Sequence, residues 1–184
     1  MIIVNDIKEN WRSILLKALA IQVAFIVLHY SYDFFPNLIT KTFSGTNEST
    51  FQHLKIAFFA TIFVNVVEYF IKRKQITDQN NFIFSRMAAT TILPWIIFLG
   101  FYTPIAFYGQ YHSVLAEIVS ANVVLYASSA ASILLQNHVE NSQPTPAFQV
   151  MVSLLFLISF SMFIVFTYKA PWTDMFAQPP GWER

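Results

Sequence analysis

Two pairs of side chains that can bind a metal ion or move protons stand four residues apart in the sequence. His29 and Asp33 form one pair, and Ser49 and His53 form the other. Residues four apart lie on the same face of a helix, so each pair presents its polar groups together. Imidazole and carboxylate groups are ligands of catalytic zinc, and a histidine beside a carboxylate is also a general acid–base pair. The spacing therefore indicates either chemistry, provided that the two segments meet in the fold.

The composition indicates that these pairs lie on segments that cross a membrane. Of the 184 residues, 55% are hydrophobic and only 11% are charged, and the mean hydropathy is +0.50. A soluble domain of this length is far less apolar. The net charge of +1 and the scattered basic residues argue against a nucleic-acid partner. Cysteine is absent, so a metal site would have to use histidine, aspartate or glutamate.

Five apolar segments are long enough to span a bilayer, whose core of about 30 Å requires roughly 20 helical residues. Lipid offers the backbone no hydrogen-bond partners, so each span must be a helix. We therefore expect an all-α fold: a single domain over residues 1–184, forming an integral bundle of five transmembrane helices in the cell membrane. The expected spans are 11–34, 49–72, 81–107, 112–137 and 146–168, followed by a tail at 169–184.

The positions of lysine and arginine predict the orientation of this bundle. Basic residues precede or begin the first span and surround the loop after the second span, and such residues favour the cytoplasmic side. They are Lys8, Arg12, Lys17, Lys72, Arg73, Lys74 and Arg86. With five spans, the N-terminus is expected in the cytoplasm and the C-terminus outside. On the cytoplasmic side, we expect Glu68 and Lys72 to form an ordinary ion pair between residues four apart on one helix. We expect Glu140 to be solvated.

Most of the chemically active side chains fall on the predicted outer side, where we expect a polar pocket. Two of them, Lys55 and Glu117, lie inside predicted spans, where a charge is costly and usually faces the bundle interior. A Lys55–Glu117 or Lys55–Glu48 ion pair is the structural alternative. Asn47 is expected to cap the second span, with Glu48 favoured by the helix dipole. The expected lining residues are His29, Tyr32, Asp33, Glu48, Ser49, His53, Lys55, Tyr102, Glu117 and Trp172.

The polar motif resembles that of a known family. Asn47-Glu48-Ser49-x-Phe51-Gln52-His53-x-Lys55, together with His29-x-x-Tyr32-Asp33 and the tail motif around Pro171-Trp172, is similar to an uncharacterised bacterial family of small multi-span membrane proteins, a domain of unknown function. Its hallmark reads Asn-Glu-Ser-x-Trp-Glu-His-x-Lys. The present chain has Phe51 and Gln52 in place of Trp and Glu, and Glu117 in place of Asp. The resemblance implies that the motif is more than a helix cap, but it implies no activity.

Three functions fit these residues. The first is binding, or assistance in transport, of a small polar or lipid-headgroup ligand in the outward-facing pocket, with aromatic walls. The second is a zinc-dependent membrane hydrolase, with His29, Asp33, His53 and Glu117 as candidate metal ligands and His112 as a further one. The third is a structural subunit of a larger membrane complex, which would add a protein partner to the lipid bilayer. Whether the protein is an enzyme stays open.

The tail after the last span contains three prolines and cannot be helical throughout. We expect Trp172 and Phe176 either to cover the entrance between the first, second and fourth spans or to anchor the tail at the membrane interface.

Overall fold

The computed structural model describes residues 11–111, 113–142 and 144–179. In these residues the chain forms helices and no strands. The elements are α1 (Trp11–Phe34), α2 (Leu38–Phe43), α3 (Thr50–Lys72), α4 (Gln79–Tyr108), α5 (Val114–Asn141), α6 (Pro146–Tyr168) and the short 3-10 helix η1 (Asp174–Phe176).

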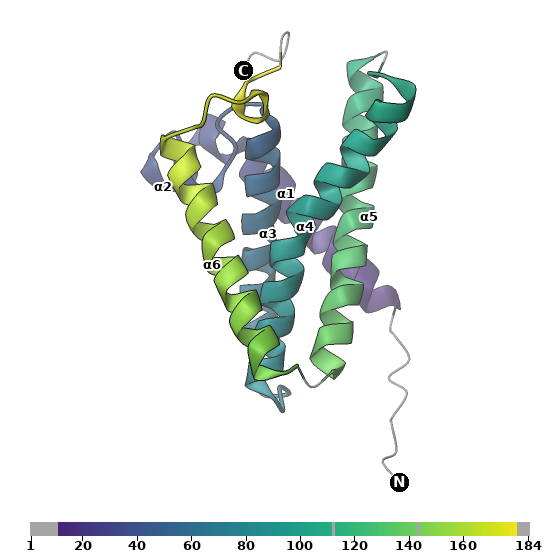
Figure 1. Cartoon of the computed structure of the whole chain (residues 1–184), viewed down its shortest axis with the longest axis vertical. Coiled ribbons are helices and arrows are strands. Elements are labelled where there is room, and N and C mark those ends of the chain that lie inside the picture. Colours follow the sequence, from purple (N-terminus) through teal and green to yellow (C-terminus); the bar gives the residue numbers. More distant parts are fainter. Residues whose placement is uncertain (1–10, 112, 143, 180–184) are drawn as a thin grey trace.

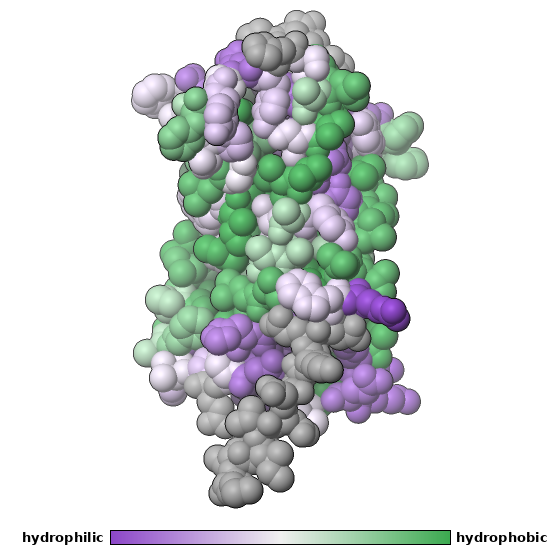
Figure 2. Space-filling view, turned by 90° about the vertical axis from the view of Figure 1, so that its right-hand side faces the viewer, coloured by the Kyte–Doolittle hydropathy of each residue, from purple (hydrophilic) through white to green (hydrophobic). Residues whose placement is uncertain are grey.

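Five of these helices, α1, α3, α4, α5 and α6, are long and apolar enough to cross a membrane. The expected all-α bundle of five transmembrane helices is therefore confirmed. Successive long helices run in opposite directions, so the start of α1 and the C-terminal segment lie at opposite ends of the bundle (Figure 1). Hydrophobic residues form a belt between two more polar ends (Figure 2). Which end faces the cytoplasm stays a prediction from the basic residues.

We call the two ends of the bundle by their position in Figure 1. The upper end holds the C-terminal end of α1, all of α2, the start of α3 and the η1 segment. The lower end holds the start of α1, the end of α3, the start of α4 and the end of α5. Because α1 and α3 are antiparallel neighbours, residues near 29 and near 53 meet at the upper end.

Side-chain caps fix where the helices begin. Ser49 is the N-cap of α3, and its Oγ accepts a hydrogen bond from the Gln52 N–H. Asn47, which was expected to cap this helix, instead accepts a bond from the Ser49 N–H at 3.0 Å and so orders the preceding loop. Asp78 caps α4 in the same way as Ser49 caps α3. The loop before α3 is therefore a defined turn that ends at residue 49.

Helix α3 lies at the centre of the bundle, between two groups of buried side chains. One group joins α1, α3, α4 and α5 and includes Ile21, Ala60 and Leu93. The other is aromatic and joins α3 to α6, with ring centroids of Phe58 and Phe163 5.0 Å apart. Lipid is as apolar as these side chains, so close packing, rather than removal from water, holds the helices together.

Helices α4 and α5 approach each other closely at Gly100. A Cβ atom added there would lie 3.1 Å from Val124 Cγ1 and 3.8 Å from Ser128 Oγ. On α5, the serines near this contact, Ser128, Ser129 and Ser132, are buried. Small residues let helix backbones approach closely within a membrane, so these serines and Gly100 allow the close contact of α4 with α5.

The short helix α2 is fastened to the bundle by Lys55. This side chain is completely buried, and its Nζ donates to the Lys41 carbonyl at 3.0 Å and to Thr167 Oγ1 at 3.2 Å. Lys41 lies in the last turn of α2, where backbone carbonyl groups without helical partners favour a cation. The Lys55 ammonium group is the cation that donates to the Lys41 carbonyl. A hydrogen bond of 2.6 Å between Thr42 Oγ1 and the Tyr168 hydroxyl adds a second link, from α2 to α6. Lys55 thus holds α2, and with it the loop that follows.

We expect Gly100→Val to lower the stability of the purified protein by about 1–3 kcal/mol, because the branched side chain would overlap Val124 across the α4–α5 contact. Thermal unfolding in detergent measures this change. The matched control is Leu99→Val, since Leu99 is 62% exposed on the neighbouring position and should tolerate a smaller apolar side chain. Equal losses in the two variants would show that close packing at residue 100 does not matter.

We expect Lys55→Met to speed backbone hydrogen exchange in α2 by about 10-fold, because the Lys41 carbonyl would lose its buried donor. Exchange in α4 and α5 should stay unchanged. Lys169→Met is the control, since Lys169 is exposed beyond the end of α6. Unchanged exchange in α2 of the Lys55 variant would mean that Lys55 does not fasten this helix.

Candidate metal centre

Three side chains from two helices and a loop converge at the upper end of the bundle. His29 lies near the end of α1, His53 lies in the first turns of α3, and Glu48 lies in the loop directly before α3. In the described part of the chain, these three residues form the one group of histidine and acidic side chains whose arrangement could hold a metal ion. The sequence predicted the two histidines as metal ligands and placed Glu48 in the pocket lining, without naming it as a ligand.

The three potential ligand atoms form a nearly equilateral triangle. His29 Nε2 and His53 Nε2 are 3.2 Å apart. Glu48 Oε2 lies 3.4 Å from His29 Nε2 and 3.3 Å from His53 Nε2. In a tetrahedral zinc site, ligand atoms about 2.0–2.1 Å from the ion lie about 3.3–3.4 Å from one another. The spacing of the triangle is therefore that of three corners of a tetrahedron around zinc.

The backbone fixes which nitrogen of His53 faces this triangle. His53 Nδ1 lies 2.9 Å from the Ser49 carbonyl oxygen. A carbonyl only accepts hydrogen bonds, so Nδ1 is the nitrogen that donates a proton, and Nε2 of the neutral ring keeps its lone pair. Metal-binding histidines are commonly oriented by such a bond from the second ring nitrogen. Ser49 thereby contributes twice: its hydroxyl caps α3 and its carbonyl orients His53.

The surroundings of the triangle leave it accessible from one side. Phe25, one turn before His29 on α1, packs against both imidazole rings, with centroid distances of 5.9 Å to His29 and 6.3 Å to His53. The side chains of His29 and Glu48 are 14% and 11% exposed, whereas that of His53 is 35% exposed. A substrate or a water molecule could thus reach the triangle beside His53, while Phe25 screens it from the bundle interior.

A close approach of the loop to α1 brings Glu48 into place. A Cβ atom added at Gly45 would lie 2.8 Å from Ile56 Cδ1 and 3.6 Å from the His29 carbonyl oxygen. The loop therefore runs directly against the backbone that carries His29. Glycine at this position allows the loop to lie there, and Glu48 follows three residues later.

The other predicted ligands and lining residues lie outside the triangle. Asp33 is exposed at the end of α1, and Glu117 lies in the first turn of α5; neither joins His29, Glu48 and His53. Tyr32 is partly buried on α1. Tyr102 hydrogen-bonds to the Thr50 hydroxyl and links α4 to the start of α3. His112 lies outside the described residues.

Lys55 lies away from the triangle although it is only two residues from His53. Two helical residues turn the side-chain direction by about 200°, so one residue faces α1 and the other faces α2 and α6. The partners of Lys55 are the Lys41 carbonyl and Thr167, and the ion pairs found in the described part of the chain do not include it. The polar motif therefore serves two different places in the fold.

The tail covers the aromatic group rather than the triangle. Phe176 in η1 packs against Phe51, with ring centroids 4.6 Å apart, and against Phe166 at 5.6 Å. Trp172 is 95% exposed and so lines no enclosed site. Phe176 thus closes the upper end of the α3–α6 contact, and Trp172 lies on the surface as an interfacial anchor would.

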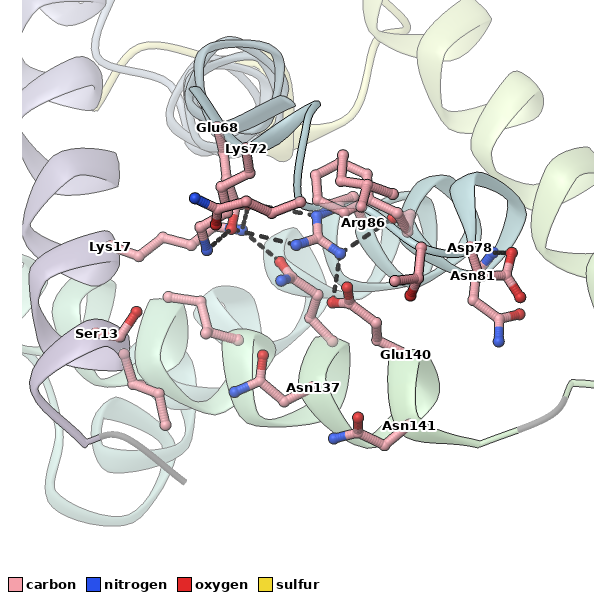
Figure 3. A pocket seen from close by; sticks show the side chains of 17 residues that line it. Ser13, Lys17, Glu68, Lys72, Asp78, Asn81, Arg86, Asn137, Glu140 and Asn141 are labelled. Carbon is pink, nitrogen blue, oxygen red and sulfur yellow. Dashed lines mark hydrogen bonds and ion pairs between the residues drawn. The ribbon is translucent and has the colours of Figure 1, made fainter. Parts of the chain in front are cut away.

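A second polar cluster at the lower end joins four helices through charged side chains (Figure 3). Glu68 on α3 accepts from Lys17 at 2.6 Å, from Lys72 at 2.7 Å and from Arg86 at 3.2 Å. Arg86 also pairs with Glu140 on α5 at 2.5 Å. The expected Glu68–Lys72 pair is therefore present but belongs to a larger network, and Glu140, which was expected to be solvated, pairs with Arg86. The place of Glu68 and Glu140 beside apolar spans, with Arg86, was the available signal that they face inward.

The sequence was also compared with known proteins. Residues 3–179 match the family described as "Family of unknown function (DUF6512)". Neither the curated proteins nor the solved structures contain a match to the chain. The match spans nearly the whole described bundle, including both polar clusters. The chain therefore belongs to the DUF6512 family, a family of unknown function.

Proposed function

We propose that this protein is a metal-dependent membrane hydrolase with a zinc ion bound by His29, Glu48 and His53. The observation that carries the proposal is the triangle of Nε2, Nε2 and Oε2 atoms with sides of 3.2, 3.4 and 3.3 Å. Two histidines and one glutamate are a ligand set of catalytic zinc, which leaves a fourth position for water or substrate. The 35% exposure of the His53 side chain supports access to that position.

Charge and hydrogen bonding favour a metal ion between the three side chains over direct contact of these side chains without one. His53 Nε2 and the Glu48 carboxylate are both hydrogen-bond acceptors, since the proton of His53 is on Nδ1. When His29 Nε2 also carries its lone pair, three acceptor atoms lie within 3.4 Å of one another and repel unless a cation lies between them. A proton on His29 could bridge some of these contacts, but a divalent cation would satisfy all three at once and would balance the Glu48 charge.

The position of the triangle suggests the class of substrate. It lies between the end of α1 and the start of α3, which are at the upper end of the bundle (Figure 1). The hydrophobic belt gives way to more polar surface at the ends of the bundle (Figure 2). A bound zinc ion supplies Lewis acidity and makes a bound water molecule a nucleophile near neutral pH. The chain itself would hold the ion, orient the ligands through Ser49, and screen the site with Phe25. Ester or amide bonds near the headgroup of a membrane lipid are the bonds that such a site could reach.

We expect the purified protein to bind about one zinc ion per chain and to lose this binding on substitution of a ligand. His29→Ala, His53→Ala and Glu48→Gln should each weaken zinc binding by more than about 100-fold, a larger loss than changes to residues that only orient ligands produce. Elemental analysis and competition with a chromogenic chelator measure the stoichiometry and the affinity.

Two kinds of control make this experiment specific. His138→Ala removes an exposed histidine at the lower end and should leave zinc binding unchanged. Asp33→Asn and Glu117→Gln test the other carboxylates that the sequence offered as ligands, and they should also have little effect. Substoichiometric zinc in the unaltered protein, or unchanged affinity in the His29 and His53 variants, would contradict the metal centre.

We expect the zinc-loaded protein to release fatty acid or another cleavage product from ester- or amide-linked lipids in mixed vesicles. Removal of zinc with a chelator should abolish the release, and readdition of zinc should restore it. Mass spectrometry of the extracted lipids measures the products, with Glu48→Gln as the inactive control. Stoichiometric zinc binding without zinc-dependent cleavage of any lipid in the mixture would contradict the proposed hydrolase activity. It would still support the zinc site.

A further inference from the structure

A cavity of about 490 Å³ opens at the lower end of the bundle, far from the triangle (Figure 3). It lies between α1, α3, α4 and α5, and its volume is within the usual range for small-ligand sites. Its walls combine the charged cluster around Glu68 with amides such as Asn137 and Asn141 and with a few apolar side chains such as Ile14 and Phe82.

The charged cluster in this wall has more donors than acceptors. Lys17, Lys72 and Arg86 are three cations, whereas Glu68 and Glu140 are two carboxylates, so the hydrogen-bonded cluster carries one positive charge in excess. Asp78 also lines the cavity and adds a third carboxylate, so the lining as a whole has three cations and three carboxylates. The Asp78 carboxylate lies outside the hydrogen-bonded cluster and caps α4 by accepting from the Asn81 N–H at 3.0 Å.

The lysines are the groups with donors to spare. An ammonium group has three N–H donors. Lys17 Nζ uses one on Glu68 and one on Gln136, and Lys72 Nζ uses one on Glu68. Arg86, in contrast, is occupied by Glu68, Glu140, Ser85 and the Phe82 carbonyl. The side of the cavity formed by Lys17 and Lys72 can therefore still accept an anion.

We propose that this cavity binds the phosphate group of a phospholipid headgroup, with Lys17 and Lys72 as the phosphate ligands. Lysine is a common phosphate ligand, and basic pockets between transmembrane helices are typical sites for anionic headgroups. Three observations support a lipid as the source of the phosphate. The cavity lies at the end of the hydrophobic spans, it contains apolar side chains beside the cations, and a further basic residue, Arg73, follows Lys72 at the same end.

The test compares two neighbouring lysines by native mass spectrometry of the full-length protein with added phosphatidylglycerol. Lys72→Gln should weaken phosphatidylglycerol binding about 5-fold, the effect of one lysine on an anionic lipid. This variant leaves the Arg86 ion pairs in place, so the bundle should remain folded. Lys74→Gln is the matched control, because Lys74 lies beyond the end of α3 and does not line the cavity. Lys17→Gln should weaken binding as well, and its thermal unfolding reports whether it is folded.

A second arm separates a lipid headgroup from free phosphate. Inorganic phosphate and glycerol phosphate, added as competitors, should displace phosphatidylglycerol only weakly if the apolar part of the lipid contributes. Equal weakening by Lys72→Gln and Lys74→Gln would show nonspecific attraction to a basic surface and would overturn the proposal. Displacement by inorganic phosphate at concentrations comparable to the lipid would overturn the lipid as the source of the phosphate.

Discussion

The lack of hydrogen-bond partners in lipid is the constraint on which this structure depends. Backbone groups in the bilayer must be satisfied within helices, and charged side chains must face one another, the bundle interior or water. Five apolar helices in antiparallel succession follow from this constraint. So does the position of the two clusters of ionisable side chains, one at each end of the bundle. The same antiparallel succession brings residues 29 and 53 together, because the end of α1 lies beside the start of α3.

Helix α3 shows how one segment can serve several roles when its faces point in different directions. His53 faces α1 and the triangle, whereas Lys55 reaches the last turn of α2 and Thr167 on α6. Further along, Glu68 forms the centre of the lower cluster. Lys55 also affects the triangle indirectly. It fixes the position of α2, and the loop after α2 contains Glu48. A charge that is costly to bury thus orders a loop that supplies a potential metal ligand.

Apolar length and polar spacing in the sequence were enough to predict the five spans and the convergence of His29 with His53. The remaining site residues were harder to predict. Asp33 was paired with His29 because it lies one turn away; it is exposed at the end of α1 and is not part of the triangle. Glu48 was read as a residue that favours a helix N-terminus. Helical periodicity does not apply to a loop. The position of the Glu48 carboxylate depends on the course of the loop backbone, which the contact of Gly45 with α1 and the hydrogen bond of Asn47 to Ser49 determine.

The sequence by itself determined that this is an all-helical membrane protein, because composition and the length of apolar runs dictate what can be stable in lipid. It also determined that His29 and His53 share an end of the bundle. The tertiary structure alone decided that Glu48 completes the triangle, that Lys55 turns away from it, and that Glu68, Arg86 and Glu140 form one cluster across three helices. The physical reason is that these contacts join segments far apart in the chain. The rotation of each helix and the course of each loop set such contacts, and packing of the whole bundle fixes both.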